Sequence, residues 1–244
     1  MSIYGEGFAR VYNRDWAFYS DHVWAFVRHV AHPEARTWLD ACCGAGALLA
    51  KVCEAGYEAS GFDLSHHQLA FARENAPQAE LHHADVRTFS LGRRFDVVTC
   101  MFDSLNYLTD PPDLALALAG LDTHLAERGS LVFDVNTYEG LEDAWQRTQA
   151  IDDVHHTLTI EMSFDATTAL GRGLISGTVR DGGACCQFEE EHVERGYRAE
   201  EIEAMLDDLG LSFTKYDGDT LEPPGERPGR LLYVCRHEEE RRCD

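Results

Sequence analysis

The chain has 244 residues, of which 44% are hydrophobic and 26% charged, enough for one soluble domain with a substantial core and a modest insertion. Its 43 acidic and 21 basic residues give a formal charge of −22, which repels nucleic-acid backbones and anionic membrane surfaces. We therefore expect no nucleic-acid or membrane partner. Because no apolar run is long enough to span a bilayer and no secretory signal is evident, we expect a cytoplasmic protein.

The first predicted element is a helix. Apolar side chains recur every three or four residues between positions 8 and 30, which predicts one amphipathic helix over that range. His32-Pro33 ends it. The stripe consists of Phe8, Tyr12, Trp16, Tyr19, Val23 and Phe26.

Strands and helices then alternate. The predicted strands are 36–40, 58–63, 79–83, 95–102 and 131–135. The predicted helices are 47–54, 65–75 with Ser65 as its cap, and 111–129, which Pro111 opens and Gly129 ends. This alternation indicates a parallel sheet with helices on both faces.

The pattern changes after Asn136. Three successive strands are predicted at 155–164, 174–180 and 185–196, with turns at 169–171 and 181–183, which indicates an antiparallel meander. A helix at 199–209 and strands at 211–216 and 230–236 complete the chain's predicted elements. We predict an α/β fold with a Rossmann-like, doubly wound, seven-stranded sheet. Residues 1–136 and 197–237 form its ligand-binding domain, and 137–196 form an antiparallel β-meander insertion.

A small-residue turn, LDACCGAG at 39–46, follows the first strand directly and precedes a helix. Glycines there let the backbone approach a ligand closely, and ligands of open parallel sheets bind beyond the carboxyl ends of the strands. Asp40, Asp63 and Asp85 stand at the ends of the first three predicted strands. These features predict a ligand site lined by three carboxylates.

Two classes of adenosine-containing ligand are compatible with this turn. A dinucleotide site would share the turn and Asp63, but its third glycine is replaced by Leu49, and Asp40 would lie beside a pyrophosphate. A ligand with an ammonium group, ribose hydroxyls and an adenine amino group matches the three acids better. S-adenosylmethionine is such a molecule. A nicotinamide-dependent oxidoreductase and a non-catalytic cofactor-binding module remain alternatives to a methyltransferase.

The sequence resembles the class I S-adenosylmethionine-dependent methyltransferases of the small-molecule branch. It is similar to the sugar-amine N-methyltransferases of antibiotic biosynthesis and their uncharacterised bacterial relatives. The motifs that carry the resemblance appear in family order over nearly the whole chain: FARVYN (8–13), LDACCGAG (39–46), GFDLS (61–65), HHADVRTF (82–89), FDVVTCMFDSLNYL (95–108), GSLVFDVNT (129–137) and FEEEHVERGY (188–197).

The resemblance implies S-adenosylmethionine as cofactor, with S-adenosylhomocysteine as product. It implies a methionine site beneath an N-terminal aromatic side chain, a ribose site, an adenine site and an aromatic ring near the sulfonium. The implied residues, in chain order, are Tyr12, Asp40, Cys42, Gly44, Gly46, Asp63, Leu64, Asp85, Val86 and Phe102. Cys42 departs from the family, because many relatives have Gly or Ala there, which implies a slightly tighter turn.

The acceptor side is less defined by the sequence. In this fold class the residues after the fourth strand face the methyl group, so Asp103 and Tyr107 are candidates to orient an acceptor, with helix capping or packing as the equal alternative. His192 and Glu191 are weaker candidates on the last meander strand, and the resemblance implies that the meander covers the substrate pocket. We expect methyl transfer to an N or O atom of a small molecule. The acceptor, and the choice between monomer and homodimer, stay open.

We expect no metal ion. The cysteines of Cys42-Cys43 and the histidines of His82-His83 are direct neighbours, which is not the spacing of zinc ligands. Side chains of adjacent residues in a strand also point in opposite directions.

Overall fold

The computed structural model describes residues 4–16, 18–181 and 184–237. The helices are α1 Glu6–Asp15, α2 Phe18–Val30, α3 Ala47–Glu54, α4 His66–Asn75, α5 Pro111–Thr123, α6 Tyr138–Ala144 and α7 Ala199–Asp208, with a short 3₁₀ helix η1 at Ser104–Tyr107. The strands of the larger sheet are β1 Thr37–Ala41, β2 Glu58–Asp63, β3 Glu80–His83, β4 Phe95–Cys100, β5 Leu125–Asn136, β10 Leu211–Asp217 and β11 Arg230–His237. The smaller sheet contains β6 Thr148–Asp152, β7 His156–Asp165, β8 Leu170–Asp181 and β9 Ala184–Arg195.

The larger sheet has seven strands in the order β10-β11-β5-β4-β1-β2-β3. Strands β1 to β5 pair in parallel, and β11 runs antiparallel to both of its neighbours. Chain connections reverse direction between β3 and β4, so the carboxyl ends of β1 and β4 flank the point where ligands bind in such sheets. The predicted Rossmann-like fold is confirmed.

Both faces of this sheet are covered. Neighbouring residues of β1 point to opposite sides, as a strand requires: Trp38 packs with Val27 of α2 and Leu49 of α3, whereas Leu39 packs into the cluster that contains Leu118 of α5 and Leu206 of α7. All six side chains are almost completely buried. The doubly wound arrangement therefore fixes the carboxyl end of β1 rigidly between two cores.

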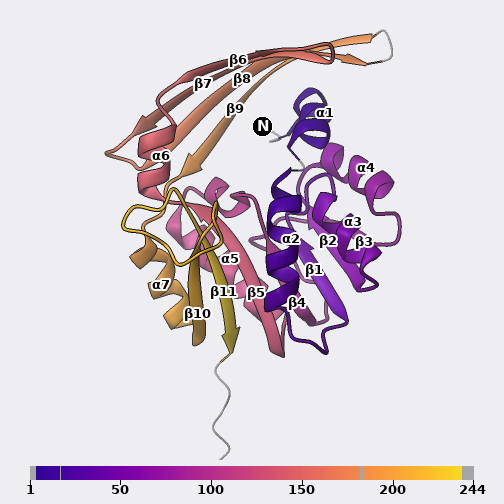
Figure 1. Cartoon of the computed structure of the whole chain (residues 1–244), viewed down its shortest axis with the longest axis vertical. Helices are drawn as coiled ribbons and strands as arrows, with labels where there is room; N and C mark the ends of the chain where they lie inside the picture. Colours follow the sequence, from indigo (N-terminus) through magenta and orange to yellow (C-terminus); the bar gives the residue numbers. More distant parts are fainter. Residues whose placement is uncertain (1–3, 17, 182–183, 238–244) are drawn as a thin grey trace, which may run out of the picture.

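The smaller sheet is an antiparallel meander in the order β6-β7-β8-β9. Figure 1 shows it arching over the carboxyl ends of the larger sheet, with α1 beneath it. The chain enters and leaves the segment that carries this sheet at one place, because Thr137, before α6, and Tyr197, after β9, form a β-bridge. The division into a ligand-binding domain and an insertion at 137–196 stays a prediction. Within the described ranges, no helix combines the length and apolar character that a membrane crossing requires.

The single helix predicted from 8 to 30 is wrong. The structure has two helices there, α1 and α2, because the apolar stripe serves two partners. Phe8 and Val11 of α1 pack against Leu158 and Ile175 of the meander. Tyr19, Val23 and Val27 of α2 pack against the larger sheet instead. One continuous helix cannot reach both surfaces.

The helix predicted at 111–129 is too long. It ends at Thr123, and Leu125, which continues the leucine spacing, is a buried residue at the start of β5, opposite Phe95. Gly129 lies inside β5 rather than at a helix end. The sequence analysis also missed η1, α6 and β6. Of the turn predicted at 181–183, residues 182–183 lie outside the described residues.

Candidate functional site

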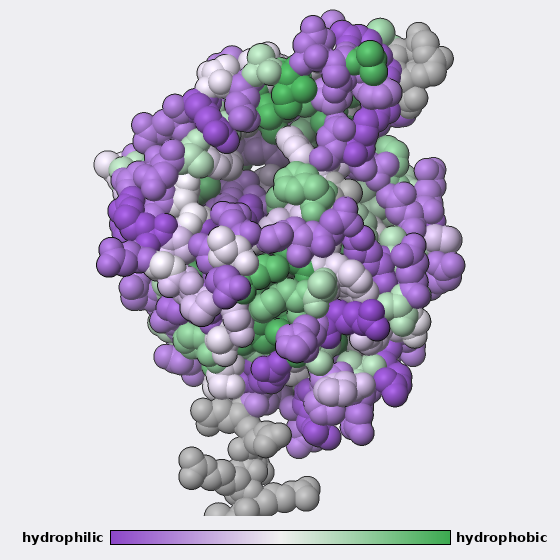
Figure 2. All heavy atoms as spheres, viewed as in Figure 1, coloured by the Kyte–Doolittle hydropathy of each residue, from purple (hydrophilic) through white to green (hydrophobic). Residues whose placement is uncertain are grey.

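Three adjoining clefts lie at the carboxyl ends of the larger sheet. The inner cleft is lined by Asp40, Cys42, Cys43, Ala45, Tyr12, Trp16, Tyr19 and Phe102, among others. The outer cleft is lined by Asp63, Leu64, Ser65, Asp85, Val86, Cys42, Tyr4 and Tyr107, among others. The roofed cavity lies under the meander and is lined by Phe8, Trp145, Met162, Ile175, Asp103, His192 and Glu194, together with side chains from the first two clefts. Figure 2 shows a hollow beneath the meander, between it and the body of the molecule.

Shared walls connect these clefts. Cys42 lines both the inner and the outer cleft. Phe102 and Tyr12 separate the inner cleft from the roofed cavity, and Tyr107 separates the outer cleft from it. A ligand that fills the inner and outer clefts therefore presents its middle to a second molecule in the roofed cavity.

The turn between β1 and α3 brings backbone close to the clefts. Gly44 and Gly46 both have positive φ, at 53° and 79°, which glycine adopts without penalty. A Cβ on Gly46 would lie 3.0 Å from the Cα of Ala72, and one on Gly44 would lie 3.4 Å from the ring of Tyr12. Cys42 has a φ of 54°, a left-handed conformation that costs a non-glycine residue about 1–2 kcal/mol. The turn thus combines close packing with local strain.

Asp40 is a buried carboxylic acid at the end of β1, with 3% of its surface exposed. The hydroxyl of Thr99 donates a hydrogen bond to its Oδ1 at 2.7 Å. Burial raises the pKa of Asp40 to about 7, the Thr99 bond opposes that rise, and the charge of Asp63 adds to it. A positive group in the inner cleft would favour the ionised form of Asp40.

Asp63 connects the glycine turn to α4. Its Oδ2 accepts the backbone N–H of Gly44 at 2.9 Å, and its Oδ1 accepts that of Ser65 at 2.8 Å. Burial raises the pKa of Asp63, whereas these N–H bonds act to lower it. Each carboxylate oxygen has a second lone pair, so the group is able to accept two hydroxyls from a ligand. Leu64, beside it, is 52% exposed on the wall of the outer cleft.

Asp85 lies in the same cleft as Asp63 but is already engaged. Its two oxygens accept hydrogen bonds from the guanidinium of Arg87 at 2.6–3.2 Å, and the backbone N–H of Arg87 donates to Oδ1. The side-chain bond from Arg87 holds the pKa of Asp85 below its usual value. Val86, which is buried, lines the cleft beside it. Recognition of an amino group by Asp85 stays a prediction.

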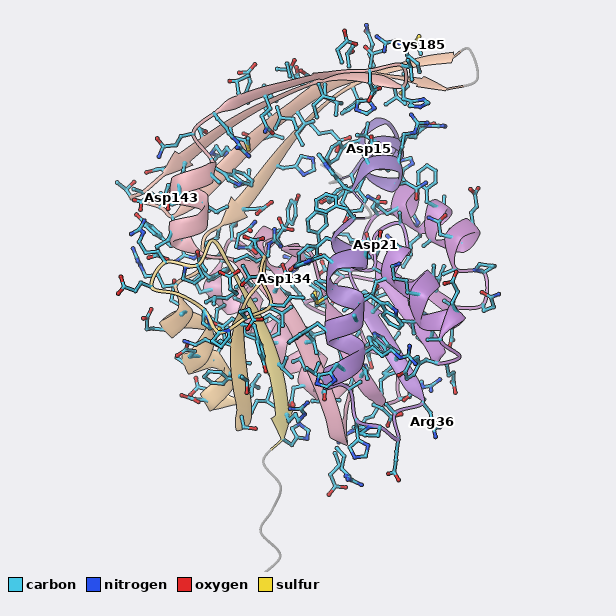
Figure 3. All side chains as sticks on the ribbon, in the orientation of Figure 1. Asp15, Asp21, Arg36, Asp134, Asp143 and Cys185 are labelled. Atoms are coloured by element: carbon cyan, nitrogen blue, oxygen red, sulfur yellow. The ribbon has the colours of Figure 1, made fainter. Side chains whose placement is uncertain are left out.

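The end of β4 carries two strained residues. Phe102 and Asp103 have positive φ values of 61° and 51°, a conformation that clusters at functional sites. Both of their backbone N–H groups donate to the carboxylate of Asp134, at 2.5 and 3.0 Å. Arg230 forms ion pairs with Asp134 and, at 3.3 Å, with Asp103. Figure 3 labels Asp134 at the upper end of the larger sheet, under the meander.

Tyr107 and His192 meet at the wall of the roofed cavity. The hydroxyl of Tyr107 lies 2.9 Å from Nδ1 of His192 and 3.1 Å from the hydroxyl of Tyr4. The Nε2 of His192 is buried without a hydrogen-bond partner among the described residues, and an oxygen of Glu190 lies 3.6 Å from it. The structure therefore joins two of the predicted acceptor-side residues into one hydrogen-bonded group.

The N-terminal segment is fastened to both sides of the site. The carbonyl of Tyr4 accepts a hydrogen bond from the hydroxyl of Ser65 at 2.8 Å, and the N–H of Gly5 donates to Glu190 of β9 at 3.1 Å. At the other end of α1, a carboxylate oxygen of Asp15 lies 3.5 Å from Nδ1 of the buried His156 on β7. This segment thus closes the space between the meander and the glycine turn.

Sequence reasoning missed Glu194 and Asn136. The side-chain N–H₂ of Asn136 donates to Oδ2 of Asp103 and to Oε2 of Glu194, both at 3.0 Å. Burial first, and then the charge of Asp103, raises the pKa of Glu194. The available signal was strand alternation, which puts Glu194 on the same face of β9 as His192.

Asp134 and Arg230 were also missed. Asp134 interrupts the apolar run of β5 and is completely buried, and a charged residue in such a run is itself a signal. Of the predicted site residues, all line the three clefts except three. Gly44 and Gly46 instead shape the turn, and Glu191 pairs with Arg172 at the surface. Asp40 and Asp63 line neighbouring clefts that share Cys42, and Asp85 lies in the cleft of Asp63.

Comparison with known proteins agrees with this geometry. Residues 39–129 match a family described as a methyltransferase domain. The dTDP-3-amino-3,4,6-trideoxy-α-D-glucopyranose N,N-dimethyltransferase of Streptomyces venezuelae is 30% identical over 188 residues, which cover 76% of this chain and 79% of that enzyme. The dTDP-3-amino-3,6-dideoxy-α-D-glucopyranose N,N-dimethyltransferase of Streptomyces fradiae is 41% identical over 102 residues, so the chain spans only 40% of that relative.

A solved structure extends the similarity to the whole fold. The crystal structure of an S-adenosylmethionine-dependent methyltransferase from Clostridium acetobutylicum has a TM-score of 0.81 and 28% identity, and the match covers 94% of this chain and 97% of that one. The meander and the larger sheet are therefore shared with a protein of known cofactor.

Proposed function

Since the chain belongs to the S-adenosylmethionine-dependent methyltransferases, we propose that its acceptor is the amino group of an amino-deoxy sugar. The enzyme transfers a methyl group from S-adenosylmethionine to an N or O atom of a small molecule. This family assignment replaces the alternatives of a nicotinamide-dependent oxidoreductase and of a non-catalytic binding module.

The residues of the inner and outer clefts fit the cofactor. Asp40, with a pKa near neutrality, would hold the ammonium group, and Asp63 would hold the ribose hydroxyls. Leu64, Asp85 and Val86 would surround the adenine in the outer cleft. When bound, the cofactor supplies a methyl group on a positively charged sulfur, which is already an excellent leaving group.

One observation carries the choice of acceptor. The roofed cavity contains the carboxylates Asp103 and Glu194, and it shares the wall of Phe102 with the inner cleft. Carboxylates in a cavity away from bulk water attract a cationic amine more strongly than a neutral hydroxyl. The cavity volume of about 320 Å³ suits a small molecule. Relatives that are N,N-dimethyltransferases of dTDP-linked amino sugars support the same choice.

The chain's own contribution is to hold and orient the acceptor. Correct orientation of two reactants contributes about 7–11 kcal/mol to such a reaction. Asp134 fixes the backbone of Phe102 and Asp103, and the Tyr107–His192 pair fixes the wall facing the acceptor. The meander and α1 would exclude water from the amine.

A paired acceptor assay tests the proposal. The protein is incubated with isotopically labelled S-adenosylmethionine and either dTDP-3-amino-3,6-dideoxyglucose or its 3-hydroxy counterpart. We expect label in the amino sugar alone. Methylation of the 3-hydroxy compound would overturn the proposed acceptor. So would the absence of methyl transfer to both the 3-amino sugar and the corresponding 4-amino sugar, if the protein binds S-adenosylhomocysteine.

A further inference from the structure

Glu194 is a buried acid, and one of its two carboxylate oxygens accepts no hydrogen bond from the described residues. It lies on β9, lines the roofed cavity and has 4% of its surface exposed. Its Oε2 accepts the hydrogen bond from Asn136 at 3.0 Å. Its Oε1 has no hydrogen-bond partner in the described part of the chain. Oε1 is not among the fully enclosed polar atoms that lack a partner, so it is open to the roofed cavity, where a ligand can reach it.

The charges around Glu194 do not balance. Asp103, Asp134 and Glu194 are three acids near Arg230; Arg147 also lines the roofed cavity, and among the described residues it forms no ion pair with Glu194. Arg230 already pairs with Asp103 and Asp134, and no ion pair links it to Glu194. The other titratable groups that line this cavity are the hydroxyls of Tyr4, Tyr12 and Tyr107 and the ring of His192. The cluster therefore has room for one more positive charge.

Asp103 is less available than Glu194. Its Oδ2 accepts a hydrogen bond from Asn136, and its Oδ1 pairs with Arg230 at 3.3 Å. Because Asn136 donates both of its side-chain hydrogens, one to each acid, it fixes the two carboxylates relative to each other. Only Glu194 presents an oxygen that this cluster leaves unused.

We propose that Oε1 of Glu194 binds the amino group of the acceptor and takes up its extra proton, so that the amine is neutral when it is methylated. This inference rests on the proposed function. In the step, an N–H bond of the bound ammonium breaks, its electron pair stays on nitrogen, and an O–H bond forms at Oε1. Carboxylate and ammonium become carboxylic acid and amine, and no other reactant is needed.

Burial makes Glu194 suited to this role. Removal from water and the neighbouring charge of Asp103 raise its pKa, which brings a carboxylate closer to the proton affinity of an amine. Glu194 also lies on β9, which pairs with β8 in the meander that covers the cavity. The same residue is therefore placed to attract the ammonium and to retain its proton inside the closed site.

Two glutamates of β9 provide a matched experiment. Glu194→Gln is compared with Glu191→Gln, because Glu191 lies on the opposite face and pairs with Arg172 at the surface. The acceptor is dTDP-3-amino-3,6-dideoxyglucose, and kcat and KM are measured across pH. We expect Glu194→Gln to lose about 100-fold in kcat/KM at about pH 7 and less than about fivefold at about pH 9.5, where the free sugar is already a neutral amine. Glu191→Gln should follow wild type throughout.

Binding measurements separate this role from a structural one. Calorimetry in the presence of S-adenosylhomocysteine should show that wild type prefers the amino sugar to its 3-hydroxy counterpart and that Glu194→Gln loses this preference. Glu194→Asp, which keeps a carboxylate, should recover part of the rate. A Glu194→Gln variant that is folded, binds S-adenosylhomocysteine normally and has the wild-type pH profile would overturn the inference but not the acceptor. Wild type that methylates no amino sugar would overturn both.

Discussion

The hydroxyl of Tyr107 lies 2.9 Å from Nδ1 of His192, although 85 residues separate them in the chain. Tyr107 belongs to the short helix after β4, and His192 belongs to β9, the last strand of the meander. The pair thus joins the larger sheet to the smaller one inside the site. Since His192 has no hydrogen-bond partner on its other nitrogen among the described residues, this bond alone satisfies its ring.

Tyr107→Phe should destabilise the protein. It leaves a buried imidazole without its hydrogen bond, which costs about 1–3 kcal/mol in the free energy of unfolding. Tyr138→Phe is the matched control, because the Tyr138 hydroxyl bonds a carbonyl at an exposed site, and it should cost less than about 0.5 kcal/mol. Urea unfolding measures both. Equal losses of unfolding free energy in the two variants would show that the Tyr107–His192 hydrogen bond does not stabilise the fold.

Asp63→Ala should weaken binding of S-adenosylhomocysteine by at least about tenfold, because hydrogen bonds from ribose hydroxyls to a charged group are lost. The substitution also removes the acceptor for the N–H groups of Gly44 and Ser65. Asp165→Ala, at the exposed end of β7, controls for loss of one negative charge. Calorimetry gives both affinities. An Asp63→Ala variant that binds as tightly as wild type would remove the ribose assignment.

Asp40 should make cofactor affinity dependent on pH near neutrality. With a pKa of about 7, its carboxyl is ionised above that value and neutral below it. An ammonium group binds the ionised form better, so affinity for S-adenosylhomocysteine should fall as the pH is lowered through about 7. Asp40→Asn should bind weakly and without this dependence. A wild-type affinity that is flat over this range would contradict the role of Asp40.

The same carboxyl should affect stability with the opposite sign. Its pKa rises from 3.8 when unfolded to about 7 in the ligand-free fold, so the folded state binds the proton more tightly. The free energy of unfolding of wild type should therefore fall relative to that of Asp40→Asn as the pH rises from about 4 to about 7. At about 1.4 kcal/mol per pKa unit, the fall approaches about 4 kcal/mol. Urea unfolding across pH, without ligand, measures this difference.

Gly46→Ala should be more damaging than Gly92→Ala. Both positions have positive φ, so alanine suffers backbone strain of about 1 kcal/mol at either. Only at Gly46 does the added Cβ meet a neighbouring backbone, 3.0 Å from the Cα of Ala72, whereas nothing lies within 4 Å at Gly92. We expect Gly46→Ala to cost about 2–4 kcal/mol in unfolding free energy. Similar costs at the two glycines would exclude close packing between the turn and α4.

Much of the fold was predictable because local signals and packing agree. The predicted bounds of α3 and β2 match the structure, and Ser65 caps α4 by accepting the N–H of Gln68. The apolar stripe over 8–30 led to the wrong prediction of one helix, because the spacing of apolar residues shows which face of a helix is apolar and not which surface covers that face. Leu125 misled because a buried strand beginning next to a helix continues its leucine pattern.

Some residues of the site were likewise predictable from the sequence, and others were not. The strand-end acids Asp40, Asp63 and Asp85 were predictable because parallel strands bring their carboxyl ends to one edge. Glu194 was not, since it follows three other glutamates in a segment that reads as an exposed charged strand. Its depth depends on the curvature of the meander and on Asn136, which lies 58 residues earlier in the chain. Strand alternation puts Glu194 on the same face as His192, but the contact with Asn136 leaves no periodic trace in the sequence.

The bonds that fasten Tyr4 and Gly5 to Ser65 and Glu190 have a kinetic consequence. One short stretch of chain contacts both the outer cleft and the meander over the roofed cavity. We expect its displacement to break both hydrogen bonds and to loosen the two clefts together. We expect product release, and not formation of the new carbon–nitrogen bond, to be the rate-limiting step of turnover.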